Sequence, residues 1–313
     1  MTLAIVFGAN GFIGTHVAAA LRTGSNIEIV GAGIGRPSPG LEEDWLGVDL
    51  LSDDRLETHL LAFRPDVVVN CAGATEGATA DLVRANVLTA ARLVEAIARS
   101  GVGTRLVHIG SAAEYGSGPI GRPVDEATCP SPHSPYGIVK LAATQLVAAS
   151  AAAGKDAVVL RVFNALGPGM PAESMPGAAL QRLTDAVSCF TSRIEMGPLG
   201  AVRDFIDVRD VATAVVAACV ADRLDAPIVN VGSGIGHSAR ELLLAMAERL
   251  GFAGEISEAS AGSSRSSDVL WQVADVSLAD RLLGWRPVHD LRSSVEYMTA
   301  GTGSGGPSHP IVP

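Results

Sequence analysis

Short runs of β-branched and other apolar residues alternate with longer amphipathic stretches along the first two-thirds of the chain. The apolar runs have the length and composition of buried strands and cover residues 3–7, 27–31, 67–70, 105–109 and 157–162. The stretches between them have the spacing of helices that bury one face and cover residues 13–22, 53–63, 81–100 and 136–153. This alternation predicts an α/β fold: a Rossmann-type, doubly wound parallel sheet with helices on both faces.

The last third of the chain has a different pattern. Pro and Gly cluster between residues 167 and 177, and further helix or strand signals recur at 208–221, 228–231 and 239–250. We expect the strand at 228–231 to return to the main sheet. A smaller C-terminal substrate-binding lobe then accounts for the remaining elements.

These signals predict two structural units and a tail. The dinucleotide-binding domain covers residues 1–165 and also receives the segment 206–232 as a strand. The substrate-binding lobe is made of residues 166–205 and 233–300. Residues 301–313 are rich in Gly, Ser and Pro without periodicity, which predicts a disordered tail.

Composition narrows the class of partner. Of the 313 residues 48% are hydrophobic and 18% charged, so a large core can be buried. The net charge of −10 repels nucleic acid and anionic membranes, and no apolar stretch is long enough to span a bilayer. We therefore expect a cytoplasmic protein with neither partner, in which an anionic ligand is met by backbone amides and a few arginines.

The four cysteines have wide and irregular spacing, without a CxxC pair. They are Cys71, Cys129, Cys189 and Cys219. This spacing predicts neither a metal site nor a disulfide framework, but small, mostly buried thiols in a reducing compartment.

A glycine-rich turn follows the first predicted strand. Residues 8–14 read GANGFIG, and an amphipathic helix begins directly after them. Glycines here allow a tight turn and bring backbone amides at a helix N-terminus close to a pyrophosphate. We expect the dinucleotide cofactor to contact Gly8, Asn10, Gly11, Phe12, Ile13 and Gly14.

The end of the second predicted strand bears on the choice between NAD and NADP. NAD-binding proteins usually place an acidic residue there to bond the ribose hydroxyls. Here the strand ends in glycines, Glu28 comes too early, and Arg36 follows in the loop. An arginine suits a 2′-phosphate, which favours NADP over NAD. The alternative is that Arg36 is a solvated loop residue.

A Tyr–Lys pair is the main catalytic candidate. Tyr136 and Lys140 lie four residues apart on a predicted helix and so share one face. The lysine charge lowers the pKa of the phenol from its usual value of about 10, so that the tyrosine can transfer a proton while hydride moves. The pair alone is common in helices. It becomes specific with Ser111, whose hydroxyl follows a predicted strand and can hold the substrate oxygen near the phenol.

With these residues the chain resembles the extended short-chain dehydrogenases/reductases, which include sugar-nucleotide epimerases, dehydratases and reductases. The resemblance runs from residue 3 to about 298. Its motifs, in order, are GANGFIG, Asp49-Leu50, NCAG (70–73), Asn86, SAAEYG (111–116), SPYGIVK (134–140), RVFNALGPG (161–169), RDFIDVRDVA (203–212), NVGSG (230–234) and LGWRP (283–287).

The resemblance implies further ligand contacts. Asp49 and Leu50 would border the adenine, and Lys140 would also bond the nicotinamide ribose. The other implied cofactor contacts are Cys71, Ala72, Gly73, Asn86, Tyr136 and Phe163. The implied substrate residues are Ser111, Ala112, Asn164, Arg203 and Arg265, of which Asn164 and the arginines would hold a nucleotide diphosphate. Alternatively, Arg203 pairs structurally with Asp204 or Asp207.

One departure from the family pattern concerns the reaction type. The 4,6-dehydratases of this family place an Asp-Glu pair directly after the catalytic hydroxyl, whereas this chain has Ala112 and Ala113, with Glu114 one position later. We therefore do not expect elimination of a 6-hydroxyl. The chain is most similar to reductases of nucleotide-linked 4-keto-6-deoxyhexoses.

The leading hypothesis is NAD(P)H-dependent reduction of such a 4-keto-6-deoxysugar, with Tyr136 as the proton donor. The alternatives are an NAD-dependent nucleotide-sugar 4-epimerase and, from another class, a non-catalytic dinucleotide-binding sensor. We also expect a homodimer, because two predicted helices carry apolar and small residues over much of their surfaces. These residues are Leu82, Val83, Leu88, Leu93 and Ile97 on one helix, and Leu141, Ala142, Leu146, Ala149 and Ala153 on the other.

Overall fold

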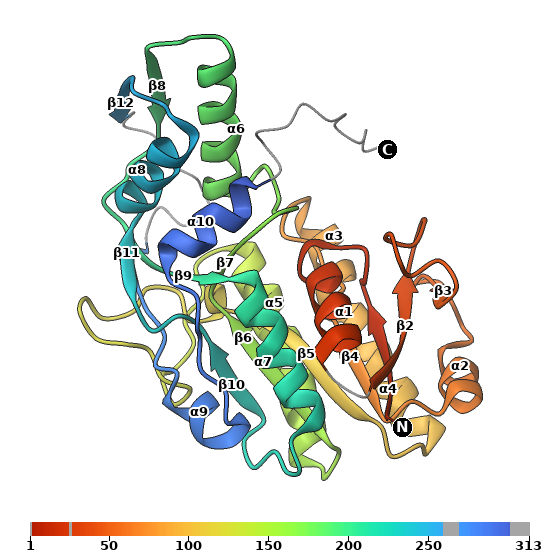
Figure 1. Cartoon of the computed structure of the whole chain (residues 1–313). Helices are drawn as coiled ribbons and strands as arrows, with labels where there is room; N and C mark the ends of the chain where they lie inside the picture. The colour runs from red at the N-terminus through yellow and green to blue at the C-terminus, as the bar shows by residue number, and fades with distance from the viewer. Residues whose placement is uncertain (1, 25–26, 259–268, 301–313) are drawn as a thin grey trace.

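The structure is a computed structural model and describes residues 2–24, 27–258 and 269–300. Its centre is a seven-stranded, wholly parallel sheet in the order β10-β6-β5-β4-β1-β2-β3 (Figure 1). The strands are β1 (Thr2–Phe7), β2 (Ile27–Gly33), β3 (Trp45–Gly47), β4 (Val67–Asn70), β5 (Arg105–Ser111), β6 (Ala157–Val162) and β10 (Ile228–Val231). Between β1 and β4 the order in which successive strands are added to the sheet reverses. Ligands of such sheets bind at this switch point. The doubly wound prediction is therefore confirmed.

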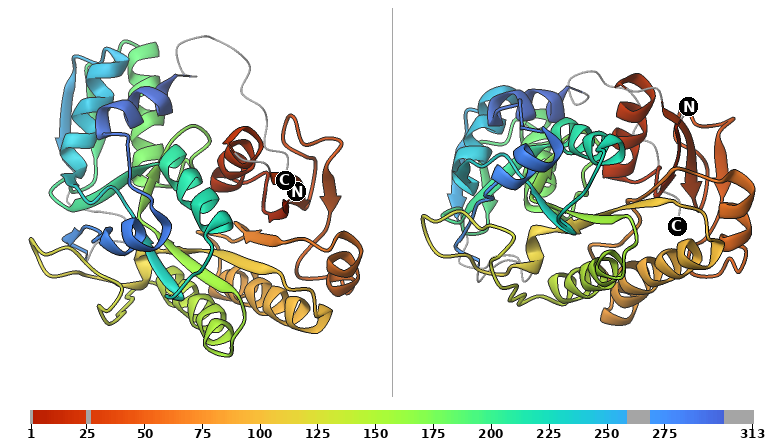
Figure 2. Two further views of the ribbon diagram at one scale, coloured as in Figure 1. Left: turned by 60° about the horizontal axis from the view of Figure 1, so that its bottom comes forward. Right: turned by 90° about the horizontal axis from the view of Figure 1, so that it is seen from below.

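Helices cover both faces of this sheet, as the view from below shows (Figure 2). On one face pack α1 (Phe12–Gly24) and α7 (Val208–Val220), which share a core with the sheet. On the other face lie α2 (Leu56–Phe63), α4 (Thr89–Ser100) and α5 (Pro135–Ala152). The strands are buried on both sides, which is why they appear in the sequence as continuous apolar runs.

The helix predicted over residues 81–100 is interrupted. It consists of α3 (Thr79–Leu82), a π-helical turn over Val83–Leu88 and α4. Asn86 lies in the π turn, where the wider winding turns its side chain inward. Apolar spacing alone did not predict this interruption.

A second unit packs beside the carboxyl ends of the strands. Its core is formed by α6 (Met175–Ser188), α8 (Ala239–Leu250) and α10 (Leu291–Thr299). Two small sheets support it: β7 (Asn164–Leu166), β9 (Val202–Asp207), β11 (Gly236–Ser238) and β13 (Trp271–Gln272) in one, β8 (Arg193–Met196) and β12 (Glu255–Glu258) in the other. Of these elements the sequence pattern had indicated only α8.

The chain passes between the two units more often than the sequence indicated. The segment 206–232, which we expected to enter the main sheet as a strand, supplies α7 as well as β10. Residues 277–285, which we assigned to the lobe, instead pack on the main sheet. There α9 (Ser277–Leu283) contacts α7 and β10, and Ala279 and Trp285 join the main core. Residues 301–313 lie outside the described part of the chain.

Two expectations about side-chain burial need correction. Leu82, Leu93 and Ile97 are buried within the chain's own core, so they cannot form an interface with a second copy. Among the cysteines, Cys129 and Cys189 are exposed rather than buried, while burial raises the pKa of Cys71 and Cys219 to about 12. All four cysteines are free. None of the helices in the described ranges is long and apolar enough to cross a membrane.

Candidate active site

The glycine turn between β1 and α1 is built by close backbone contacts. Gly8 has φ +73° and donates its N–H to the carbonyl of Ala32 at the end of β2, at 2.8 Å. A Cβ at Gly8 would lie 2.7 Å from the backbone nitrogen of Ala72, so only glycine fits where the turn meets the loop after β4. The turn ends at Phe12, where α1 begins. A tight glycine turn before a helix N-terminus fits a dinucleotide pyrophosphate.

The end of β2 presents an arginine and no acid. The amide Nδ2 of Asn10 donates to the carbonyl of Ile34 at 2.9 Å and so joins the glycine turn to this strand end. Trp45 packs against Gly31 and Gly33. Arg36 follows, exposed, and makes no hydrogen bond or ion pair with any residue in the described ranges. Its guanidinium is therefore available to an anionic ligand.

The adenine candidates lie in the next loop. The carboxylate of Asp49 accepts hydrogen bonds from the N–H of Leu51 and the hydroxyl of Ser52, both within the same turn. Leu50 is buried against the sheet. Asp49 thus shapes the loop through its own side chain, and its contact with adenine stays a prediction.

The loop after β4 is held by two buried side chains. The Asn70 carbonyl accepts from the N–H of Ala72 at 3.1 Å, and its amide lies 3.0 Å from Nδ1 of His108. Asn86 donates from the π turn to the carbonyl of Ala74, and its own oxygen packs against Gly73. Asn70 and His108 were missed as supports. The signal for Asn70 was its place as the first residue of the NCAG motif.

Ser111, Tyr136 and Lys140 come from adjacent elements. Ser111 ends β5 and caps the short 3-10 turn that follows it, Ala112–Glu114. Tyr136 and Lys140 lie in the first turns of α5. This helix approaches the Ser111 turn so closely that a Cβ at Gly137 would lie 2.5 Å from the carbonyl oxygen of Ala113. The predicted catalytic residues are thus brought to one edge of the sheet, with Tyr136 half-buried.

Lys140 is a buried cation. Its Nζ donates to the carbonyl oxygen of Ile109 in β5 at 2.5 Å. Burial lowers the pKa of Lys140, and the carboxylate of Glu114 acts in the opposite direction. Burial and the charge of Lys140 hold the pKa of nearby His108 well below its usual value, so that imidazole is neutral.

The predicted substrate residues lie between the Ser111 turn and the lobe. Ala112 and Phe163 are buried in one apolar cluster with Tyr115. Asn164 starts β7 and donates its amide to the carbonyl of Asp204 at 2.9 Å. It therefore lies beside the strand that carries Arg203.

Arg203 is only 8% exposed, and burial lowers its pKa to about 10. The two aspartates considered as its structural partners bind other groups. Asp204 accepts hydrogen bonds from Ser233, Gly234 and Ala274, and Asp207 pairs with Arg209 at 2.7 Å. Arg265, the second predicted diphosphate ligand, lies outside the described residues.

Two further side chains near Ser111 were not predicted. Glu114 is fully buried and pairs with Arg161 of β6 at 2.7 Å, so its carboxylate is enclosed in the interior. Gln272 of β13 donates its amide to the carbonyls of Ala112 and Gly116 and so ties the lobe to the Ser111 turn. The signal for Glu114 was that it is the one carboxylate in the SAAEYG motif. No sequence pattern indicated Gln272.

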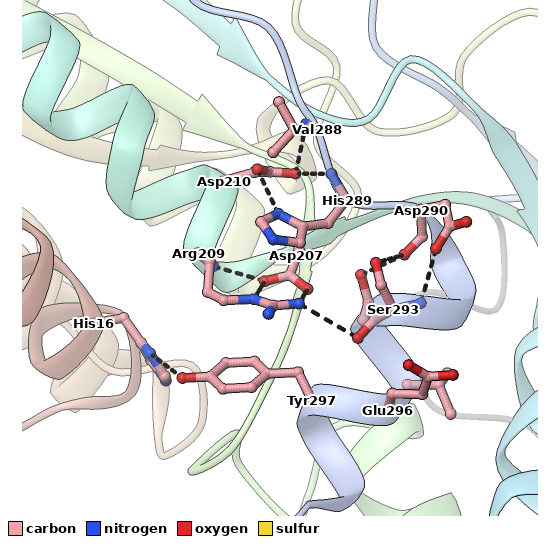
Figure 3. A network of polar contacts seen from close by, with 12 residues as sticks. His16, Asp207, Arg209, Asp210, Val288, His289, Asp290, Ser293, Glu296 and Tyr297 are labelled. Carbon is pink, nitrogen blue, oxygen red and sulfur yellow. Dashed lines mark hydrogen bonds and ion pairs between the residues drawn. The ribbon is translucent and has the colours of Figure 1, made fainter.

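A polar network joins α1 to α10 across the two units (Figure 3). The Nδ1 of His16 on α1 lies 3.4 Å from the hydroxyl of Tyr297, and its Nε2 lies 3.1 Å from the carbonyl of Pro168. Arg209 stacks over the Tyr297 ring at 4.1 Å and donates to the carbonyl of Ser293. The helix that follows the glycine turn thus contacts both the lobe and the loop after β7.

Comparison with known proteins agrees with this geometry. The model of the NAD dependent epimerase/dehydratase family matches residues 4–232. A dTDP-6-deoxy-L-talose 4-dehydrogenase (NAD(P)(+)) of Kitasatospora kifunensis is 36% identical over 298 residues, which cover 94% of this chain and 93% of that protein. A GDP-6-deoxy-D-mannose reductase of Pseudomonas aeruginosa is 28% identical over 93% of each chain.

The solved structures include similar proteins with ligands. The protein MoeE5 in complex with UDP-glucuronic acid and NAD superposes with a TM-score of 0.82 at 30% identity, over 95% of this chain and 97% of that one. The structure named RMD from Pseudomonas aeruginosa complexed with NADPH has a TM-score of 0.82 at 24% identity, over 96% and 99% of the two chains.

The fold and the site together define a nicotinamide-dependent enzyme of the short-chain dehydrogenase/reductase type. The chain belongs to the NAD dependent epimerase/dehydratase family. This confirms the resemblance to extended short-chain dehydrogenases/reductases, the predicted enzyme class and the NAD(P) cofactor.

Proposed function

We propose that the chain catalyses the NAD(P)H-dependent reduction of a nucleotide-linked 4-keto-6-deoxysugar to the 4-hydroxy sugar. The observation that carries this proposal is the chemistry around Ser111. A phenol and a lysine adjoin its turn, while positions 112 and 113 are alanines and the Glu114 carboxylate is paired inward with Arg161. Such a site favours proton transfer to a carbonyl oxygen over elimination. The 36% identity to a dTDP-6-deoxy-L-talose 4-dehydrogenase supports the same conclusion.

Each residue has a distinct role in this reaction. The glycine turn and the α1 N-terminus bind the pyrophosphate, and Lys140 holds the ribose and keeps a positive charge beside the phenol. A dihydronicotinamide held by these residues would supply the hydride that reduces C4 of the sugar. Ser111 donates a hydrogen bond to the C4 oxygen, and Tyr136 gives that oxygen its proton. Oxidation of the alcohol runs through the same groups in reverse.

In this proposal Asn164 and Arg203 bind the nucleotide diphosphate. Their strands, β7 and β9, are paired beside the Ser111 turn, and the guanidinium of Arg203 is already largely desolvated. A desolvated arginine forms stronger charge-assisted hydrogen bonds to phosphate than a solvated one. Arg203 therefore gives this acidic protein a local site for a dianion.

A direct assay tests the proposal. The purified protein is incubated with dTDP- and GDP-linked 4-keto-6-deoxyhexoses and NADPH, and cofactor oxidation is followed by absorbance. The reverse reaction is measured with dTDP-6-deoxy-L-talose and NADP⁺, and Tyr136→Phe is the inactive control. We expect turnover of at least one keto sugar. Interconversion of UDP-glucose and UDP-galactose, without reduction of any keto sugar, would contradict it.

A 4-epimerase is the second candidate, favoured by 26% identity to a UDP-glucose 4-epimerase of Halalkalibacterium halodurans over 94% of this chain. An epimerase oxidises and re-reduces the same sugar, so it has no need to release its cofactor. A purified protein that retains stoichiometric NAD through gel filtration would favour the epimerase. Rapid exchange with added NADPH would favour the reductase.

A further inference from the structure

Glu114 occupies a junction of the elements that carry the reacting groups. One carboxylate oxygen, Oε1, accepts the backbone N–H of Ser111 at 2.8 Å and the hydroxyl of Thr144 at 2.9 Å. The other, Oε2, accepts Nε of Arg161 at 2.7 Å. Ser111 ends β5, Thr144 lies one helical turn after Lys140 on α5, and Arg161 belongs to β6. A single buried carboxylate thus joins three elements.

The pair formed by Glu114 and Arg161 is almost completely removed from water. The exposures of the two side chains are 0% and 1%, and the Arg161 guanidinium also stacks 4.5 Å from the Tyr115 ring centroid. A buried ion pair is costly to desolvate, and replacing it by apolar residues is often neutral or stabilising. Stability alone is therefore a weak account of its presence beside Ser111 and Lys140.

The charge of Glu114 also acts on Lys140. The titratable groups that act on this lysine within the described residues include Glu114, Cys71 after β4 and His108 in β5. Burial raises the pKa of Cys71 to about 12 and lowers that of His108, so neither is charged at neutral pH. Among these groups the negative charge comes from Glu114, and it opposes the desolvation that lowers the pKa of Lys140.

We propose that Glu114 is the positioning residue of this site: its carboxylate fixes the Ser111 turn against the helix of Tyr136 and Lys140 and keeps the Lys140 ammonium protonated. The inference rests on the proposed function in taking Ser111, Tyr136 and Lys140 as the reacting site. It adds a fourth residue, which does not touch substrate. The position that follows the two alanines of SAAEYG thus serves catalysis through the lysine.

The chain contains only two lysines, Lys140 and Lys155, which makes a direct test practical. In protein labelled with ¹³Cε-lysine each residue gives one signal, and Lys155→Arg assigns them. Lys155 is exposed and serves as an internal control in the same sample. The midpoint of the Lys140 titration is measured in wild type, Glu114→Gln and Thr144→Val. The last variant removes one hydrogen bond to Glu114 without changing charge.

We expect Glu114→Gln to lower the Lys140 midpoint by about 1 pH unit, because it removes the negative charge that raises the pKa of Lys140. Thr144→Val should leave that midpoint unchanged, and Lys155 should titrate alike in every sample. In alcohol oxidation the alkaline limb of the pH–rate profile, on which Lys140 loses its proton, should move to lower pH in Glu114→Gln only. A Lys140 midpoint equal to that of wild type in folded Glu114→Gln would overturn the proposal.

Glu114→Gln leaves the Arg161 charge buried without its partner, and this variant can fail to fold. The titration is then made on Arg161→Met and on the double variant Glu114→Gln, Arg161→Met, which differ from each other only in the charge of Glu114. A lower Lys140 midpoint in the double variant than in Arg161→Met supports the inference, and an equal or higher one overturns it. The titration requires no substrate. If the protein reduces no keto sugar, the proposed function fails while the result for Glu114 still stands.

Discussion

Replacing Arg203 by alanine tests whether the enzyme captures its substrate through the diphosphate. Arg203 is 8% exposed, and burial lowers its pKa to about 10 from its usual value above 12. At about 1.4 kcal/mol per pH unit, the buried cation carries roughly 3 kcal/mol of desolvation cost. A phosphate placed against it recovers part of that cost, because opposite charges attract strongly where water is excluded.

A charge-assisted hydrogen bond to phosphate contributes about 1.5–3 kcal/mol, which is similar in size to this desolvation cost. Arg203→Ala should therefore lower kcat/KM for the nucleotide sugar by about 10- to 150-fold, at about 1.4 kcal/mol per decade. Cofactor affinity should stay nearly unchanged, because Arg203 lies on β9 and not on the main sheet. Reduction of a small ketone without phosphate should also be little affected.

The assay compares kcat/KM for a nucleotide sugar and a small ketone, with NADPH affinity measured by fluorescence. Arg193→Ala is the matched control, because it removes one positive charge from an exposed position of the same unit. Equal losses on the phosphorylated and unphosphorylated substrates in Arg203→Ala would refute the reasoning and make Arg203 structural. A similar loss of kcat/KM in Arg193→Ala would show that the effect comes from the change in net charge.

Three other predictions concern the catalytic pair, the cofactor and the assembly. Tyr136→Phe should lose most turnover and still bind NADPH, while Lys140→Met should lose both turnover and NADPH affinity. Steady-state rates within a few-fold of wild type in Tyr136→Phe would exclude the tyrosine as proton donor. Arg36→Ala should reduce the ratio of kcat/KM for NADPH to that for NADH, and an unchanged ratio would make the arginine a bystander. The protein should be a homodimer through the faces that carry Leu88 and Leu146, which are 45% and 40% exposed; light scattering should give about twice 32 kDa for wild type and 32 kDa for Leu88→Glu, and a wild-type mass near 32 kDa would count against the dimer.

Most of the main sheet could be predicted almost residue by residue from local sequence patterns, but the three-residue edge strand β3 was missed. Strands β4, β6 and β10 have the predicted bounds, since each is a predominantly apolar run between polar turns. The small sheets could not be predicted in this way. Strand β13 has two residues and β11 three, and both are held by pairing with β9 rather than by any pattern of their own.

The site shows the same limit at the level of single side chains. Glycine turns and the Tyr–Lys spacing are local signals, and the structure brings their elements to one edge of the sheet. The role of Glu114 depends on Arg161, which is 47 residues away and lies opposite Gly110 in the sheet register. Only the packing of β6 beside β5 turns that carboxylate inward. Gln272 depends in the same way on β13 reaching the Ser111 turn.

The repeated passage of the chain between the two units limits how this enzyme can be recombined. Strand β7 leaves the main sheet, α7 and β10 return to it, α8 lies in the lobe, α9 returns again and α10 ends in the lobe. No single cut yields a contiguous fragment that contains the lobe and nothing else. A hybrid made by exchanging one C-terminal piece with a relative would also exchange β10, α9 and the surroundings of Trp285 in the main core. New sugar specificity in this scaffold is therefore better obtained by point substitutions in β7 and β9 than by swapping segments.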